Sequence, residues 1–255
     1  MSKTNSAAFG CTYRHLLIAV LSVTLFSSCV TGLMNSYLGL LGYDHETLIQ
    51  EQRYSRDYSG MKGGIRPGTG DVTVWQIAAA HPRAKEVSGE TLAAARKDPR
   101  KNLPVLVGFI TEGMSDPFEK IKVIHDWVIY NTVYDYAAYE SGRYPDQSYV
   151  GVCASGKGVC AGYSALFKAM CEMADIRCQI VGGYGRGVNY NPADRDEEIK
   201  FNHDWNAVLV GDGWYFVDAT WDSNHLDSLD DYSDLWLFVH PRAMIMSHFP
   251  GNEDW

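Results

Sequence analysis

The chain has 255 residues, of which 46% are hydrophobic and 21% are charged, and its formal net charge is -9. These fractions are typical of a globular protein and exclude a disordered, collagen-like or coiled-coil chain. The acidic balance argues against a nucleic-acid-binding domain, which needs a basic face, so we expect no nucleic-acid partner. The length corresponds to one sizeable domain with an appendage, or to two small domains.

Residues 1–28 have the pattern of an export signal. Lys3 and Arg14 precede an apolar run, Leu16–Phe26, which is shorter than the ~20 residues that span a bilayer. The run ends in Ser27-Ser28-Cys29, which resembles a bacterial lipoprotein box, so we expect cleavage before Cys29 and lipid attachment to it. The alternative is an uncleaved anchor helix. We expect an exported protein held by this lipid alone at a bacterial membrane, on its periplasmic or cell-surface side.

Residues 29–70 mix short apolar pieces with glycine-rich and proline-rich ones and are predicted to form a tether. Residues 71–255 are predicted to form the folded domain. It holds four cysteines with no CxxC pair, so we expect no metal and no cofactor. Cys171 and Cys178 are assigned to the core, and Cys153 is a candidate for redox pairing. The aspartates between Asp222 and Asp234 are interpreted as a solvated acidic loop rather than a calcium site.

The first clear helix opens at Asp116-Pro117, after which apolar residues such as Ile121, Ile124 and Trp127 recur at helical intervals. A polar, turn-rich loop follows over 139–149, and a second apolar helical stripe begins after Gly158. Strands are then predicted over 177–183, 204–210 and 214–217, with a hairpin turn at 211–213. A block of helices followed by a block of strands predicts an α+β fold, with helices packed on one face of an antiparallel sheet.

Three residues at the ends of these elements could carry covalent catalysis. Cys160 falls in the first turn of the second helix, where free N–H groups and the helix dipole favour a thiolate. His203 starts one strand and Asp218 ends the next, so they could serve as base and as the group that orients the base. Each residue alone is more often structural: a buried cysteine, a satisfied histidine, a capping aspartate. Their combination favours a nucleophile, a base and an orienting group.

The expected hairpin leaves a distance between His203 and Asp218. A turn centred on Asp212 puts Ala207 opposite Asp218, so His203 and Asp218 share a face but lie four residues out of step, roughly 13 Å along the strands. We therefore expect a bulge or a wider turn to shift the register.

Three ordered motifs resemble the transglutaminase-like superfamily of papain-like cysteine enzymes. They are Gly158-Val159-Cys160-Ala161-Gly162-Tyr163, His203-Asp204-Trp205-Asn206 and Val217-Asp218-Ala219-Thr220-Trp221-Asp222. Upstream, Ile124-His125-Asp126-Trp127 is similar to the helix that precedes the family's nucleophile. Downstream, Phe238-Val239-His240-Pro241 and Ser247-His248-Phe249-Pro250 are similar to the tail of the kyphoscoliosis-peptidase branch.

The resemblance covers roughly residues 75–255 and implies a papain-like core, with Cys160 as nucleophile, His203 as base and Asp218 as orienting residue. The family usually has a small residue where Asp204 stands, and alternation along the strand should point Asp204 away from the site. We expect the backbone N–H of Cys160 to be one oxyanion donor. The predicted walls of the cleft are Trp205, Trp221 and Trp127, with core packing the alternative for Trp127.

The function expected from these residues is hydrolysis of peptide or glutamine amide bonds through an acyl-thioester on Cys160. The expected partner is a protein or peptide substrate. A protein-glutamine transglutaminase or deamidase uses the same three residues and remains an alternative, as does a non-catalytic module that binds peptide or glycan in the same cleft. The oligomeric state is left open.

Overall fold

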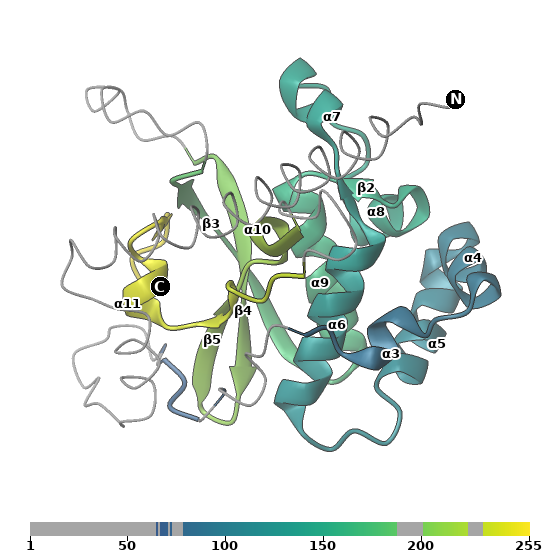
Figure 1. The fold of residues 1–255 in the computed structure, drawn as a ribbon. Coiled ribbons are helices and arrows are strands. Elements are labelled where there is room, and N and C mark those ends of the chain that lie inside the picture. Colours follow the sequence, from purple (N-terminus) through teal and green to yellow (C-terminus); the bar gives the residue numbers. More distant parts are fainter. Residues whose placement is uncertain (1–64, 66, 71, 73–78, 188–200, 224–231) are drawn as a thin grey trace, which may run out of the picture. The chain divides into compact units, whose positions relative to one another are not determined.

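A helical layer packs against an antiparallel sheet in this computed structural model (Figure 1), which describes residues 65, 67–70, 72, 79–187, 201–223 and 232–255. The expected export signal, Cys29 and most of the predicted tether lie outside the described residues. All described residues belong to one compact unit within residues 52–255. Within the described part, no helix combines the length and the apolar character needed to cross a membrane.

The helices are α3 (Pro82–Lys85), α4 (Gly89–Lys97), α5 (Pro99–Ile110), α6 (Pro117–Asn131), α7 (Tyr136–Ser141), α8 (Tyr149–Ser155), α9 (Cys160–Met173), α10 (Ala219–Ser223) and α11 (Pro241–Met244). As expected, α6 opens at Asp116-Pro117: the side chain of Asp116 accepts a hydrogen bond from the N–H of Phe118 at 2.9 Å. The expected loop over 139–149 is instead partly helical, because α7 extends to Ser141.

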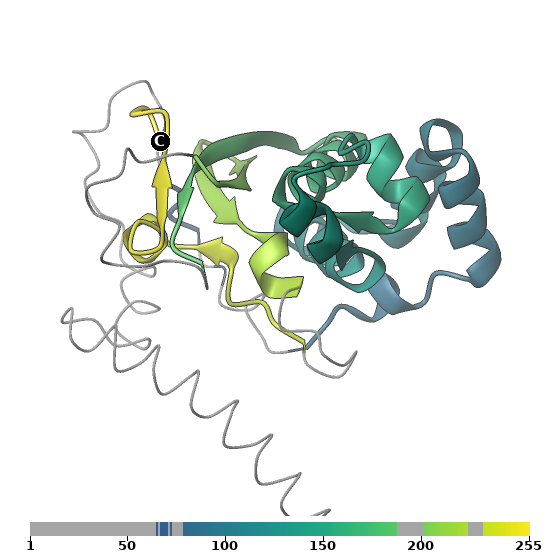
Figure 2. The same cartoon turned by 90° about the horizontal axis from the view of Figure 1, so that it is seen from above.

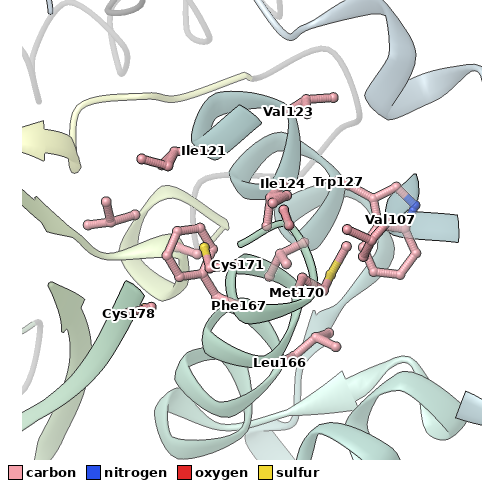
Figure 3. Close-up of a cluster of buried hydrophobic side chains, with 14 of the residues drawn as sticks. Val107, Ile121, Val123, Ile124, Trp127, Leu166, Phe167, Met170, Cys171 and Cys178 are labelled. Atoms are coloured by element: carbon pink, nitrogen blue, oxygen red, sulfur yellow. The ribbon is translucent and has the colours of Figure 1, made fainter. Parts of the chain in front are cut away.

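Helices α6 and α9 form the centre of the hydrophobic core, and α9 also packs on strands β3 (Arg177–Gly185) and β4 (His203–Val210). Figure 3 shows part of this core, with side chains of α6 and α9 interleaved. Cys171 and Cys178 lie in it, as predicted. Cys153 is also buried, with no disulfide to another described cysteine, and burial raises its pKa to about 11, which disfavours a reactive thiolate.

The sheet has the strand order β6-β5-β4-β3-β7, with every neighbouring pair antiparallel. Its remaining strands are β5 (Gly213–Val217), β6 (Leu237–Val239) and β7 (His248–Pro250). Two further strands, β1 (Val133–Tyr134) and β2 (Lys157–Gly158), pair in parallel and lead the chain into α9. Helices on one side and this sheet on the other confirm the α+β class, and Figure 2 shows the two layers from a second direction.

The hairpin of β4 and β5 has a tighter turn than predicted. Asn206 pairs with Val217 and Val210 with Gly213, so only Gly211 and Asp212 form the turn. Gly211 has φ 62, a left-handed conformation that glycine adopts without strain. The expected bulge or wider turn between these strands is wrong: the pairing runs without a shift, and the register shift lies between β5 and β6 at Phe216/Val217.

The same register brings the ends of the two strands closer than expected. Extended by one pair, it sets Asp218 level with Trp205, two residues from His203, or roughly 7 Å along the strand. An imidazole and a carboxylate on one face span that separation.

The last residues of the predicted tether contact the sheet. Pro67 forms a parallel bridge with Trp214, the N–H of Gly68 donates to the carbonyl of Trp214 at 2.8 Å, and the N–H of Gly70 donates to the hydroxyl of Tyr215 at 2.7 Å. The folded part of the chain therefore includes residues 67–70, slightly before the expected boundary at residue 71.

Candidate active site

His203 and Asp218 meet at the edge of the hairpin. His203 opens β4 and Asp218 follows β5 directly, and the Nε2 of His203 donates to Oδ2 of Asp218 at 2.6 Å. A Cβ atom on Gly185 of the neighbouring strand would lie 2.9 Å from Cβ of His203, so only glycine leaves this imidazole in place. Because Nε2 is occupied by Asp218, Nδ1 is the nitrogen of His203 that remains for another partner.

The carboxylate of Asp218 is held on both of its oxygens. Oδ1 accepts the backbone N–H groups of Thr220 and Trp221 at 3.0 and 3.1 Å, which caps the start of α10. Oδ2 faces His203. Asp218 is 1% exposed, so its direction is fixed by these bonds and by burial.

Cys160 is the first residue of α9, and its side chain is partly exposed. No side chain caps the start of this helix at Val159, so the N–H of Cys160 in its first turn can donate to an anion. The N–H of Val159 itself donates to Oε1 of Gln147 at 2.9 Å, which fixes the turn before Cys160. Cys160 contributes to the raised pKa of His203, after the larger contribution of Asp218.

The charges of this site favour a protonated histidine beside an ionised carboxylate. Burial alone would lower the pKa of His203, but the negative charge and hydrogen bond of Asp218, with a contribution from Cys160, raise it to about 10. Burial would likewise raise the pKa of Asp218, but the charge of His203 and the hydrogen bonds of two histidines hold it far below its usual range. An imidazolium next to a thiol is the arrangement that stabilises a thiolate.

The second of those two histidines, His248, was not among the residues that the sequence predicted for the site. It lies in β7, is 1% exposed, and its Nε2 donates to Oδ2 of Asp218 at 2.9 Å. The sequence did carry a signal, since Ser247-His248-Phe249-Pro250 was one of the resembling motifs, but nothing in it indicated a contact with Asp218.

The cluster of His203, Asp218 and His248 also has the residue types of a metal site, with ligand atoms all within 4.8 Å of one another. Tetrahedral zinc ligands bonded at ~2.0–2.1 Å stand roughly 3.3 Å apart. Here the two nitrogens lie 2.6 and 2.9 Å from one carboxylate oxygen. Those are hydrogen-bond distances, so the arrangement fits shared protons better than a metal ion.

The sequence comparisons agree with this geometry. Residues 106–219, which include Cys160, His203 and Asp218, match the Transglutaminase-like superfamily. The segment is a transglutaminase-like domain. Kyphoscoliosis peptidase of Homo sapiens is 29% identical over 167 residues, covering 64% of this chain and 25% of that protein. Hillarin of Drosophila melanogaster is 25% identical over 204 residues, covering 74% of this chain and 25% of that protein. The chain thus spans about a quarter of the length of these relatives.

Among solved structures, the transglutaminase-like domain is partly similar to a candidate cysteine protease from Cytophaga hutchinsonii. The TM-score is 0.37 and the identity 23%, with 57% of this chain and 46% of that chain covered. A structure described as a TGase has a TM-score of 0.35 and 19% identity, with 53% of this chain and 34% of that chain covered.

The three tryptophans predicted as cleft walls have different places in the transglutaminase-like domain. Trp221 is partly exposed, and its ring centroid lies 5.3 Å from that of His203. Trp205 also lies beside His203, with ring centroids 6.0 Å apart, but it is 1% exposed. It therefore packs against the imidazole on the side of the protein interior. Trp127 is a core residue, as Figure 3 shows, and is not a cleft wall.

A second polar cluster lies within the domain where a solvated acidic loop was expected. Asp222 is fully buried and accepts hydrogen bonds from the Nε2 of His125 at 2.9 Å and from the hydroxyl of Ser233 at 2.6 Å. The Nδ1 of His125 donates to Asp126, also at 2.9 Å. The expectation is therefore wrong for Asp222, because buried donors, and not water, satisfy its charge. Asp227, Asp230 and Asp231 lie outside the described residues.

Proposed function

We propose that this protein is a cysteine-dependent hydrolase of peptide bonds or glutamine amide bonds, with Cys160 as nucleophile, His203 as base and Asp218 as orienting residue. The observation that carries the proposal is the 2.6 Å hydrogen bond from Nε2 of His203 to Asp218, which leaves Nδ1 for the thiol at the start of α9. The match of residues 106–219 to the Transglutaminase-like superfamily and relatives named as peptidases support this chemistry.

The reaction would begin with the thiolate of Cys160 attacking the carbonyl carbon, while the backbone N–H of Cys160 donates to the developing oxyanion. Nδ1–H of His203 then gives its proton to the departing amine as the C–N bond breaks and an acyl-thioester remains. Water attacks the thioester, His203 takes a proton from that water, and the C–S bond breaks to release a carboxylic acid and regenerate Cys160. Asp218 holds the imidazole in one tautomer throughout.

Reactivity of the thiol tests the nucleophile before any substrate is known. At pH 6, iodoacetamide should alkylate Cys160 in the folded wild type, and the Cys160→Ala variant should lose this labelling. Cys153→Ala is the matched control, because it removes a buried thiol and should label like the wild type. Equal labelling of wild type and Cys160→Ala would exclude Cys160 as the reactive group.

The products distinguish hydrolysis from its alternatives. We would incubate the enzyme with unfolded protein substrates, using Cys160→Ala as the blank, and measure new peptide N-termini, released ammonia and incorporation of a primary amine. New N-termini indicate a peptidase, and ammonia without them a glutamine deamidase. Amine incorporation indicates a transglutaminase. Substrate binding without any of these products indicates a binding module.

The proposal includes an exported enzyme attached to a bacterial membrane by lipid on Cys29. The support is the sequence Leu25-Phe26-Ser27-Ser28-Cys29 after a short apolar run. In cells fed a labelled fatty acid, the wild type should carry the label and sediment with membranes, whereas Cys29→Ala should do neither. Labelling of Cys29→Ala would contradict this part of the proposal and leave the chemistry of Cys160 untouched.

A further inference from the structure

His248 lies outside the residues that match the superfamily, yet it contacts the proposed catalytic pair. The match ends at residue 219, whereas His248 belongs to β7 and pairs with Gly185 of β3. Its ring centroid lies 4.2 Å from that of Trp221 and 5.3 Å from that of His203. A histidine with 1% exposure in such a place must have both ring nitrogens satisfied.

The hydrogen bonds of His248 define its tautomer. An ionised carboxylate only accepts, so Nε2 carries the proton and donates to Oδ2 of Asp218 at 2.9 Å. Nδ1 lies 2.9 Å from the hydroxyl of Ser247, which can donate to it. The titratable groups that face His248 are Asp218 and His203, and burial lowers the pKa of His248, which keeps it neutral beside the charged His203.

Asp218 consequently receives four donors. Two backbone N–H groups of α10 hold Oδ1, and the imidazoles of His203 and His248 hold Oδ2. The N–H groups of α10 fix the position of Oδ1. Without His248, Oδ2 would have only one hydrogen-bond donor, His203 at the start of β4. The second imidazole closes the other side of Oδ2.

We propose that His248 is a positioning residue: its Nε2–H fixes Oδ2 of Asp218 in the direction of His203, with Ser247 holding His248 in the donating tautomer. This inference rests on the proposed function of Cys160 and His203. When His248 loses its donor, the two N–H groups of α10 still hold Oδ1, but only His203 holds Oδ2, so the hydrogen bond between Oδ2 and His203 is less restrained and weakens. The imidazolium is then less stabilised, the proton returns to the sulfur, and the thiolate forms only at higher pH.

The test is the rate of alkylation of Cys160 by iodoacetamide between pH 4.5 and 9.5, on full-length protein whose folding is checked by near-UV circular dichroism. His248→Phe keeps an aromatic ring but has no donor, and we expect its profile to move up by about one pH unit, which is about tenfold less alkylation at pH values below the midpoints of both profiles. The rate at pH 9.5 should equal that of the wild type. His248→Gln, whose amide can donate to Asp218 and accept from Ser247, should stay within about twofold of the wild type.

Ser247→Ala keeps the inference testable if His248→Phe does not fold, because Ser247 is only partly buried. Loss of its hydroxyl should lower the rate at pH values below the midpoints about twofold to threefold, without changing the rate at pH 9.5. A folded His248→Phe, or failing that Ser247→Ala, with the profile of the wild type would overturn the positioning role. If Cys160 of the wild type were alkylated only at the alkaline pH at which an ordinary cysteine reacts, the proposed function itself would be contradicted. The two failures are therefore distinct.

Discussion

Two histidines, the partly buried His203 and the buried His125, are bonded to aspartates, yet their surroundings suit different tasks. His203 donates from Nε2 to Asp218, and its Nδ1 is the nitrogen that we propose for the thiol of Cys160. His125 donates from Nδ1 to Asp126 and from Nε2 to Asp222, both at 2.9 Å, and is fully buried. Carboxylates raise the pKa of both, to about 10 for His203 and about 9 for His125, although burial opposes each shift.

The difference shows that a raised pKa alone does not mark a catalytic base. A histidine can exchange a proton with a substrate only if one nitrogen faces a reacting group, and both nitrogens of His125 are bound to carboxylates. His125 therefore fixes α6 to α10, which contains Asp222. Since Asp218 lies directly before α10, this buried cluster also supports one side of the proposed catalytic site.

The largest expected effect is on the rate in His203→Gln. Loss of the base should lower kcat/KM by about 10³- to 10⁴-fold. The amide of glutamine can still donate to Asp218, which also keeps its other three donors, so the free energy of unfolding should fall less than in His125→Gln. Steady-state kinetics on the substrate found by product analysis, together with urea unfolding, measure the two effects. A variant that retains activity within tenfold of the wild type would remove His203 from the mechanism.

His125→Gln should show the reverse pattern. Removing the cation leaves Asp126 and Asp222 buried without their shared partner, which should lower the free energy of unfolding by about 3–5 kcal/mol at pH 7. The kcat/KM of the folded fraction should stay within about threefold. A loss of activity as large as that of His203→Gln, at unchanged stability, would break the distinction between the two histidines.

The sequence predicted those parts of the fold that depend on local pattern. The stripe through Ile121 and Ile124 gave α6, and the alternation after Arg177 gave β3 to β5, because side-chain periodicity follows directly from backbone geometry. The register of the hairpin was less accessible. It depends on whether two or more residues form the turn, and Gly211-Asp212-Gly213 is compatible with several turns.

Of the site, the sequence identified the residues that a family motif or an element end indicates. Cys160, His203 and Asp218 were named in this way, and the structure brings His203 and Asp218 into contact. His248 and the partnership of His125 with Asp222 were missed because they join positions 30 and 97 residues apart. No periodicity relates such positions, so only the folded chain shows that their side chains meet.

The stability of the wild type should fall on the alkaline side. His125 has an ordinary pKa of 6.5 and one of about 9 when folded, so its contribution is complete below pH 6.5 and is lost as the pH rises through about 9. His203 acts in the same sense up to about pH 10. We expect His125 alone to account for a loss on the order of 3 kcal/mol between pH 6.5 and 9.5, measured by urea unfolding. The loss should be clearly smaller in His125→Gln, and an equal loss in both proteins would mean that His125 is not charged in the fold.

The smallest expected effect is that of Ser233→Ala, which weakens the buried cluster without removing a charge. The hydroxyl of Ser233 donates to Oδ1 of Asp222 at 2.6 Å, but Asp222 retains His125 and the N–H of Trp236 at 3.1 Å. The cost should therefore be about 1.5 kcal/mol, the lower end for a bond to a charged group. Ser155→Ala, which removes an exposed hydroxyl bonded only to carbonyl and N–H groups of the backbone, is the matched control and should cost less than about 1 kcal/mol. If Ser233→Ala lowered kcat/KM, expressed as a free energy, by more than it lowered the free energy of unfolding, the change in the buried cluster would have shifted Asp218 through α10. The sites of His125 and His203 would then be energetically coupled.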